Sequence, residues 1–323
     1  MSAAFSRWLR SDWFGPMLVV LIASAVMGAL SPAFLSPLNF QVLLLAIAVN
    51  TLVAFAQMII IAIGQMNLSV GAIGGLAAIS FAGMMQVWGL PPFPAAIAAV
   101  GIGCLAGVAN GVFISATGIS AFVITLASLS IFKGINLGIT KAQPFYGVPD
   151  SVKLFGGATF AAGLPWLILP TAAVILAMWY LLNRQSAGRY LLAIGGNQHA
   201  AELSGISVAR SVILAHGISG ALAALAGVLL VARLQIGQPT IGDDWLILSF
   251  AAPVIGGAVL AGGHVSVAGT VLGVVVVAII TQALVLFAID PFLVQVVLGL
   301  LILWAVGVNR LRELRVEALA KRV

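Results

Sequence analysis

The stretch NFQVLLLAIAVNTLVAFAQMIIIA, residues 39–62, contains no charged side chain and is long enough to cross a bilayer as a helix. About 20 apolar residues in a helix match the roughly 30 Å thickness of the hydrocarbon core. Similar stretches recur along the chain, so that 62% of its 323 residues are hydrophobic and only 7% are charged. Soluble domains carry about 25% charged residues because they must present a wetted surface. The sequence therefore predicts an all-α integral membrane protein.

Prolines and polar residues, which are typical of turns between helices, divide the apolar stretches into about ten expected spans. These spans lie near 16–35, 39–62, 69–88, 94–115, 119–138, 164–182, 211–232, 246–260, 266–288 and 292–308. The eighth span is short, and we expect it to continue irregularly through Gly262-Gly263. We interpret 16–35 as an uncleaved first helix rather than a signal peptide, and the chain as a single transmembrane domain over residues 1–323.

The distribution of Lys and Arg predicts the orientation, because basic residues are enriched in cytoplasmic loops. Ten spans and a cytoplasmic N-terminus place both chain ends inside, together with Arg7, Arg10, Arg184, Arg189, Arg210, Arg310, Arg312, Arg315, Lys321 and Arg322. Only Lys141, Lys153 and Arg233 then lie outside. The longest inside loop is 183–210 and the longest outside loop is 139–163. Residues 309–323 form a basic cytoplasmic tail, which either only fixes the topology or lies on the membrane as an amphipathic helix.

Glycine spacing suggests an inverted internal repeat. Gly103-x-x-x-Gly107 begins a helix pair that ends in 122–138, and Gly269-x-x-x-Gly273 begins a pair that ends in 291–307. On the predicted topology the two pairs run in opposite directions, as the inverted repeats of transporters do. Any tightly packed helix pair favours the same spacing, so both interpretations stay open.

Several kinds of chemistry are missing from the sequence. It has no Gly-x-x-x-x-Gly-Lys-Ser/Thr loop for a nucleotide. Cys104 and three widely separated histidines indicate no metal site, and all eight acidic residues map to expected loops or helix ends. A proton-coupled carrier usually needs carboxylates within the membrane. We therefore expect a transport subunit that is not an enzyme, binds no cofactor and is driven by a partner.

The inside loop contains a sharply defined local pattern. Gly195-Gly196 would let the chain turn, Asn197 is a good N-cap, and Gly205 is a typical left-handed C-terminal stop. The pattern predicts a helix of about two turns over 198–204. It is either a rigid element on which a partner docks or only a well-capped connector.

The segment Gly-Gly-Asn-x-x-Ala-Ala-x-x-Ser-Gly-Ile at 195–206 resembles the coupling region of ribose-type sugar permeases (ribose, xylose, arabinose, galactose) from bacterial ATP-binding-cassette importers. Further similar stretches are Asn67-Leu68-Ser69-Val70-Gly71, Gly237-Gln238-Pro239-Thr240 and Val254-Ile255-Gly256-Gly257, followed by Gly262-Gly263 and Ser266. They occur in the family's order over roughly residues 40–308. Asn67 stands where that family has Asp, and His264 where a basic residue, commonly Arg, is usual, so ribose specificity is not carried over.

The resemblance implies a type II-like importer permease of the bacterial cytoplasmic (inner) membrane. Two permease chains, identical or different, would form the pathway above two ATPase subunits that use ATP and Mg, and an extracytoplasmic solute-binding protein would deliver a sugar or polyol. The residues implied in coupling to the ATPase are Gly195, Gly196, Asn197, Ala200, Ala201, Glu202, Ser204 and Gly205. The expected contacts with the binding protein are Lys141, Asp150, Lys153, Arg233, Asp243 and Asp244, each of which could equally be a solvated loop residue.

Polar residues in or beside the spans are the candidates for the solute pathway: Asn67, Ser69, Asn110, Thr125, Asn136 and Gln282. Amide and hydroxyl groups suit the hydroxyls of a sugar, but the same residues also hydrogen-bond helices to one another. Lys133 is expected to extend toward a membrane interface. An autonomous secondary carrier or facilitator, and a membrane subunit without transport activity, remain alternatives.

Overall fold

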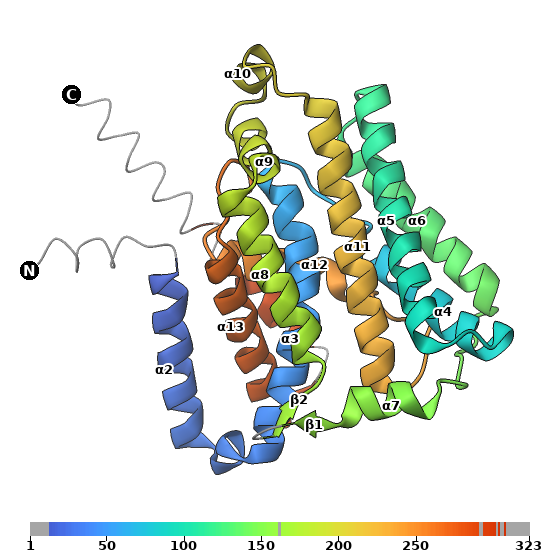
Figure 1. Ribbon diagram of the computed structural model, residues 1–323. Coiled ribbons are helices and arrows are strands. Elements are labelled where there is room, and N and C mark those ends of the chain that lie inside the picture. The colour runs from blue at the N-terminus through green and yellow to red at the C-terminus, as the bar shows by residue number, and fades with distance from the viewer. Residues whose placement is uncertain (1–12, 161–162, 291–292, 302, 304–306, 308–323) are drawn as a thin grey trace, which may run out of the picture.

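The computed structural model describes residues 13–160, 163–290, 293–301, 303 and 307, and within them it is almost entirely helical (Figure 1). The first half contains α2 (Phe14–Leu30), the 3-10 helix η1 (Pro32–Leu35), α3 (Pro37–Ala62), α4 (Val70–Trp88), α5 (Pro92–Thr117) and α6 (Ala121–Thr140). There follow α7 (Asp150–Gly157), the short antiparallel strands β1 (Thr159–Phe160) and β2 (Leu164–Pro165), and α8 (Ile168–Arg184). The remainder consists of α9 (Ser186–Gly196), α10 (Gln198–Leu203), α11 (Val208–Leu234), α12 (Trp245–Ile255) and α13 (Val267–Leu286).

The expected all-α membrane architecture is confirmed. Helices α3, α4, α5, α6, α11 and α13 are long and apolar enough to cross a membrane, and α2, α8 and α12 are apolar but shorter. Residues 293–301 of the tenth expected span are also helical. The sequence did not predict α7 in the outside loop or α9 in the inside loop. The basic tail 309–323, with Arg7 and Arg10, lies outside the described residues.

Helices α3 and α11 form the centre of the molecule. Consecutive side chains of α3 from Leu52 to Ala62 are buried, which is possible because this helix is apolar on every side. Helix α5 lies directly on α11, where Gly103 and Gly107 approach the backbone of Gly220 and His216 so closely that a Cβ on either glycine would collide. Small residues at such a contact allow two membrane helices to pack backbone against backbone.

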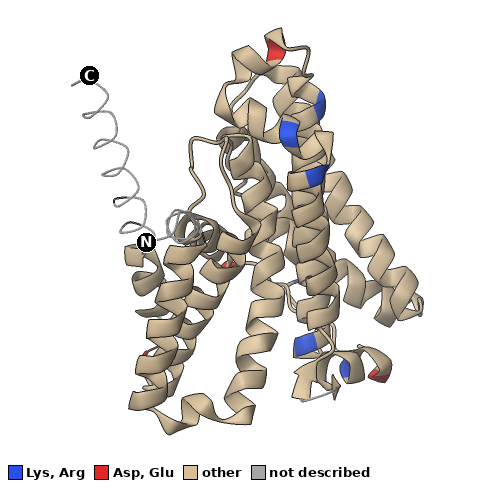
Figure 2. Ribbon diagram, turned by 60° about the vertical axis from the view of Figure 1, so that its left-hand side comes forward, with Lys and Arg blue, Asp and Glu red and all other residues tan. Residues whose placement is uncertain are grey.

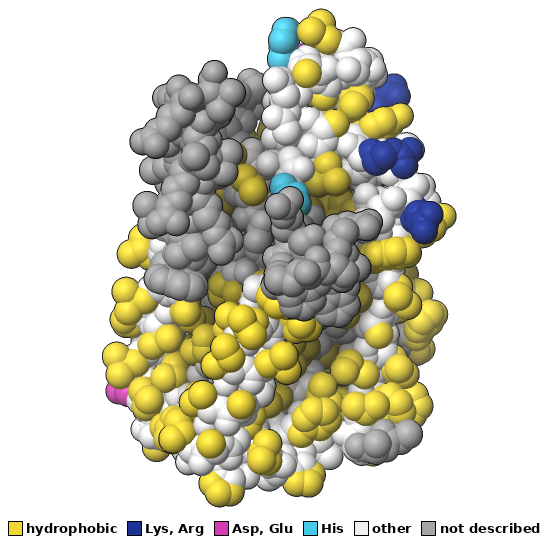
Figure 3. Space-filling view, turned by 90° about the vertical axis from the view of Figure 1, so that its left-hand side faces the viewer, with side chains coloured by type: hydrophobic (Ala, Val, Ile, Leu, Met, Phe, Trp, Pro, Cys, Tyr) yellow, Lys and Arg dark blue, Asp and Glu magenta, His cyan; other side chains and the backbone are white. Residues whose placement is uncertain are grey.

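Most of the described Lys and Arg residues lie toward one or the other end of the bundle. The Lys and Arg segments lie toward the two ends in Figure 2, and Figure 3 shows apolar side chains covering the lower part of one face below the basic ones. Arg184 ends α8, Arg189 lies on α9 and Arg210 lies in the first turn of α11, all toward the α10 end, whereas Lys153 lies on α7 at the opposite end (Figure 1). Apart from Lys133 within α6, the described basic residues therefore lie toward the two ends, in the two groups of the predicted topology.

Helices α4 and α12 both begin inside the bundle, and α12, with 11 residues, is too short to cross a membrane. The first turn of α4 lies at mid-depth, since Ile73 contacts Gly103 in the middle of α5. Trp245, the first residue of α12, packs on Gly71 and Gly74 of the same turn. The starts of α4 and α12 therefore meet inside the bundle.

The segment 235–244, which precedes α12, replaces the missing half of that helix. It runs along α4 from the α7 end toward the centre, with Gly237 on Ala82, Ile241 on Gly75 and Gly242 on Gly71. Close approach is possible because α4 presents glycines and alanines to it. The expected irregular continuation through Gly262-Gly263 is present. The eighth span is also completed on its other side, by the non-helical segment 235–244 before α12.

The element order is that of an inverted repeat. Each half has a long central helix, a second helix that begins inside the bundle, and a third helix: α3, α4 and α5 in one half, and α11, α12 and α13 in the other. Helix α11 packs on α4 and α5, and α3 packs correspondingly on α12 and α13. The glycines that suggested the repeat lie on its third helices, α5 and α13, but make different contacts: Gly103 and Gly107 face α11, whereas Gly269 and Gly273 face Gly256 and Ala252 next to or within α12.

Candidate functional site

Helix α10 is the element that the inside-loop pattern predicts. Its N-cap is Asn197, whose Oδ1 accepts a hydrogen bond from the backbone N–H of Ala200 at 3.0 Å. Ser204 N–H donates to the carbonyls of Ala200 and Ala201, and Gly205 follows with a φ of +81°. The helix projects beyond the long helices at the end opposite α7 (Figure 1). Both ends are therefore closed by local bonds, and α10 is a compact, rigid projection.

The side chains of α10 divide into a buried set and an exposed set. Ala201 is 4% exposed and packs against the core, so it supports the helix and does not offer a contact surface. Leu203 is 78% exposed at the tip, which is unusual for so apolar a residue on an isolated projection. Glu202 accepts a hydrogen bond from Gln198 Nε2 at 3.1 Å. The sequence analysis missed Leu203 because it considered mainly the capping residues of the helix. The sequence did contain a signal for an exposed contact residue, namely an apolar side chain between the polar residues Glu202 and Ser204.

Gly195 and Gly196 lie where the base of α10 meets two loops of the bundle, the α3–α4 connection and the α12–α13 connection. The sequence predicted that these glycines form a chain turn, but in the structure they are the last residues of helix α9. A Cβ on Gly195 would collide with the carbonyl oxygen of Ala62, where α3 ends, and with the N–H of Gly263. Gly263 N–H donates to Ala62 O at 3.1 Å. The base of α10 is thus in backbone contact with the α3–α4 connection and with the α12–α13 connection.

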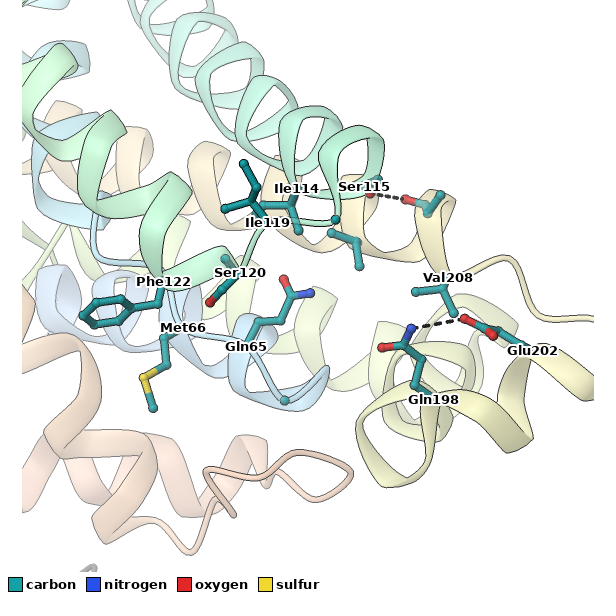
Figure 4. A pocket seen from close by; sticks show the side chains of 15 residues that line it. Gln65, Met66, Ile114, Ser115, Ile119, Ser120, Phe122, Gln198, Glu202 and Val208 are labelled. Atoms are coloured by element: carbon teal, nitrogen blue, oxygen red, sulfur yellow. Dashed lines mark hydrogen bonds between the residues drawn. The ribbon is translucent and has the colours of Figure 1, made fainter.

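A cavity of about 650 Å³ opens beside α10 (Figure 4). Gln198 and Glu202 of α10 lie on one side of it, and Ile119 and Phe122, around the start of α6, lie on another. Gln65 and Met66, in the connection between α3 and α4, line it as well. Its volume is within the range of small-molecule sites, roughly 300–1,000 Å³. The cavity reaches from the α10 end of the bundle to the irregular segment that precedes α4.

A buried hydrogen-bond network lies behind that segment. Asn67 Oδ1 accepts from both the N–H and the hydroxyl of Ser69, at 3.0 and 2.7 Å, and its Nδ2 donates to Ser219 Oγ on α11 at 3.1 Å. Asn110 Nδ2 on α5 donates to Ser69 Oγ at 2.9 Å and Asn110 Oδ1 accepts from the hydroxyl of Ser128 on α6 at 2.6 Å. Three of the predicted pathway residues therefore hold four helices together in this conformation.

Thr125 fixes the same segment from α6. Its hydroxyl oxygen accepts from the N–H of Leu68 at 3.1 Å and its hydroxyl donates to the carbonyl of Ala121 at 2.7 Å. Thr125 is fully buried, as are Asn67 and Ser69. All four residues thus stabilise the start of α4 and contact no solvent here.

The network explains how either Asn or Asp can occupy position 67. An Asn67→Asp carboxylate could accept from Ser69 as Asn does, and the Ser219 hydroxyl could turn to donate to its second oxygen. We expect the Asn67→Asp variant to unfold within a few degrees of the parent. Asn67→Leu would leave several buried groups unpaired at about 1–3 kcal/mol each and should unfold much earlier. Thermal unfolding in detergent followed by size-exclusion chromatography checks both, and equal losses in the two variants would contradict the network.

Comparison with known proteins assigns the chain. Residues 39–306 match the family model described as branched-chain amino acid transport system / permease component. The ribose import permease protein of Bacillus subtilis is 37% identical over 298 residues, 92% of each chain. The D-allose transport system permease protein of Escherichia coli K12 is 34% identical over 95% of this chain and 94% of its own. The fructose import permease protein of Rhizobium meliloti is 31% identical over 91% of this chain and 84% of its own.

The chain belongs to this permease family. It is a multi-pass membrane subunit, and its relatives are permease components of sugar import systems. No solved structure matches the permease. The described residues contain no group of His, Cys, Asp and Glu that could hold a metal ion.

The remaining predicted pathway residues of the permease lie apart from the network. Asn136 Nδ2 donates to the carbonyl of Pro239 at 3.1 Å, which ties α6 to the segment 235–244. Gln282 Nε2 on α13 donates to Asn39 Oδ1 at 2.6 Å near the start of α3. The structure therefore does not bring all six candidates into one site.

The predicted contacts with a binding protein fall into two groups. Lys141, Asp150, Lys153 and Arg233 lie at the α7 end of the permease, where Gly156 packs on the backbone of Ala232 and Arg233 and Lys153 pairs with Asp150 at 3.3 Å. Asp243 and Asp244 lie deeper, directly before α12. Lys133, which was expected to extend toward an interface, pairs through its Nζ with Asp243 Oδ1 at 2.8 Å.

Proposed function

We propose that this permease imports a neutral sugar or a related polyol. The relatives are named for ribose, allose and fructose. The amides and hydroxyls that line the cavity beside α10, such as those of Gln65 and Ser120, suit a ligand whose groups both donate and accept hydrogen bonds.

We propose that the energy comes from an ATP-binding partner subunit that docks on α10. The observation that carries this proposal is the capped, exposed α10, whose base touches the connections of α3 and α12 through Gly195. A rigid contact of this kind can convert closure of the partner into movement of the helices around a central pathway. The residues implied in coupling have different places in this arrangement. The caps and the first and last turns of α10 are formed by Asn197, Ala200, Ser204 and Gly205. The helix is joined to the bundle by Gly195 and Gly196 and packs on it through Ala201, whereas Glu202 is exposed. In this proposal the partner, and not the permease, binds ATP and Mg.

We further propose that the α10 end faces the cytoplasm of a bacterial inner membrane, with both termini on that side. The α7 end then faces an extracytoplasmic solute-binding protein, which Lys141, Asp150, Lys153 and Arg233 would contact. Charged rim residues of this kind set the register and the rate of encounter of two proteins. A second permease chain, identical or not, completes the pathway.

Purification in mild detergent from native membranes, with mass spectrometry of the associated proteins, tests the proposal. A co-purifying nucleotide-binding protein, and solute uptake in proteoliposomes that requires ATP, are the expected results. Solute flux through the permease alone, without ATP, would instead establish an autonomous secondary carrier.

A further inference from the structure

One ion pair lies within the membrane-spanning region without being enclosed by the chain. Lys133 is on α6, about 18 Å along the helix from Ala121 and about 10 Å from its end at Thr140. Its partner Asp243 follows Gly242, which packs on Gly71 in the first turn of α4. The two side chains are 43% and 45% exposed. Both charges are therefore at depth, and both are accessible from outside the fold.

Charged side chains at such a depth almost always face a bundle interior or a water-filled cavity, because contact with lipid costs several kcal/mol. The interior of this chain does not contain the pair. The surface that carries Lys133 and Asp243 is therefore incompatible with lipid. The opposite side of α6, which carries exposed apolar residues such as Ile131, is compatible with lipid.

A small cavity of about 90 Å³ lies at the pair. It is lined by Leu68 and Gly71 at the start of α4, Leu129 and Lys133 on α6, and Gly242 and Asp243 before α12. Its volume is well below the roughly 300 Å³ of an ordinary ligand pocket, so it is a contact point rather than a closed site.

The same face of α6 leads to the larger cavity beside α10. Phe122 lines that cavity, and Leu129 and Lys133 line the small one. These residues follow one another at intervals of seven and four, which places them in one row along a helix. Between the cavities lies the segment of Met66 and Leu68, which Thr125 holds through its hydrogen bond to Leu68 N–H. The two cavities therefore lie one after the other along the same face of α6, and the segment of Met66 and Leu68 separates them.

We propose that Lys133 and Asp243 line the water-filled translocation pathway and bind the hydroxyl groups of the passing solute. The inference rests on the proposed import of a hydroxylated solute. An ammonium that only donates, beside a carboxylate that only accepts, matches two neighbouring hydroxyls of a polyol. Because the ion pair is already formed, the solute exchanges one set of polar contacts for another and is held weakly enough to leave.

Water access is tested first, in the Cys104→Ala background and without any solute. Single Lys133→Cys and Leu129→Cys variants, with Ile131→Cys on the opposite side of α6 as the matched control, are exposed in proteoliposomes to a charged, membrane-impermeant thiosulfonate. We expect Lys133→Cys and Leu129→Cys to react at least tenfold faster than Ile131→Cys. A Lys133→Cys rate as slow as that of the control would overturn the proposal.

Solute contact is tested with the complete importer and radiolabelled D-ribose as the probe. We expect Asp243→Asn and Lys133→Met to lower uptake at least tenfold while the amount of co-purified ATPase and the unfolding temperature stay unchanged. Normal uptake by both variants would overturn the proposed contact. If the parent itself transports no D-ribose or other sugar, the sugar assignment fails, whereas the labelling rates still decide whether the pair lines the pathway.

Discussion

Leu203→Asp is expected to weaken the binding of the ATPase subunit by about 30-fold or more. Leu203 is 78% exposed at the tip of α10, and burying such a side chain against a partner contributes roughly 2 kcal/mol. An aspartate there would lose that contribution and would in addition place an unpaired carboxylate in the contact. The fold should not change, because Leu203 makes no part of the core. Titration of the purified permease with the purified ATPase measures the loss, and solute uptake should fall in parallel.

Leu154→Asp is the matched control. Leu154 is a leucine of similar exposure, 68%, on α7 at the opposite end of the molecule. The same change of charge and volume there should leave ATPase binding unaltered. If both variants bound the ATPase as well as the parent, α10 would not be the docking element and the coupling role proposed for it would fail.

The second large effect is expected for Gly195→Ala. The added methyl group would collide with the carbonyl oxygen of Ala62 and the N–H of Gly263, both of which are backbone atoms that cannot move aside alone. Overpacking of this kind costs about 1–3 kcal/mol and would displace the base of α10 from the two connections it touches. We expect the ATPase to bind and hydrolyse ATP almost normally while solute uptake per ATP falls at least tenfold.

Gly196→Ala provides a control at the adjacent position, since a Cβ there would meet nothing within 4 Å. The two variants carry the same change of helix propensity at neighbouring residues of α9. Equal coupling in both would show that the contact of Gly195 with Ala62 does not transmit movement.

Local signals made much of this structure predictable. The span 39–62 was evident because it has no charge and a full membrane length, and it is α3 almost to the residue. Helix α10 followed from Asn197 and Gly205, whose capping chemistry involves only neighbouring residues. Membrane helices and capped turns are encoded within one stretch of chain, so one stretch is enough to recognise them.

The arrangement around Lys133 was not predictable, because its partner is 110 residues away. Asp243 appeared to belong to an outside loop, since the polar, glycine-containing segment 235–244 has the composition of one. Its depth depends on the glycines of α4, on which it packs, and no property of the segment itself indicates that contact. Ala201 was misplaced for a related reason: an alanine in a six-residue helix carries no sign of which side is buried.

The half-length of α12 has a consequence for how the chain enters the bilayer during synthesis. Its 11 residues extend about 16 Å, roughly half of the hydrocarbon thickness, so it cannot partition into lipid as an independent unit. The stretch before it, 235–244, consists largely of turns and carries peptide groups that lipid cannot satisfy and that must be covered by protein. That cover is α4, made much earlier by the ribosome. The second half of the chain must therefore be inserted against an already assembled first half, which acts as its template.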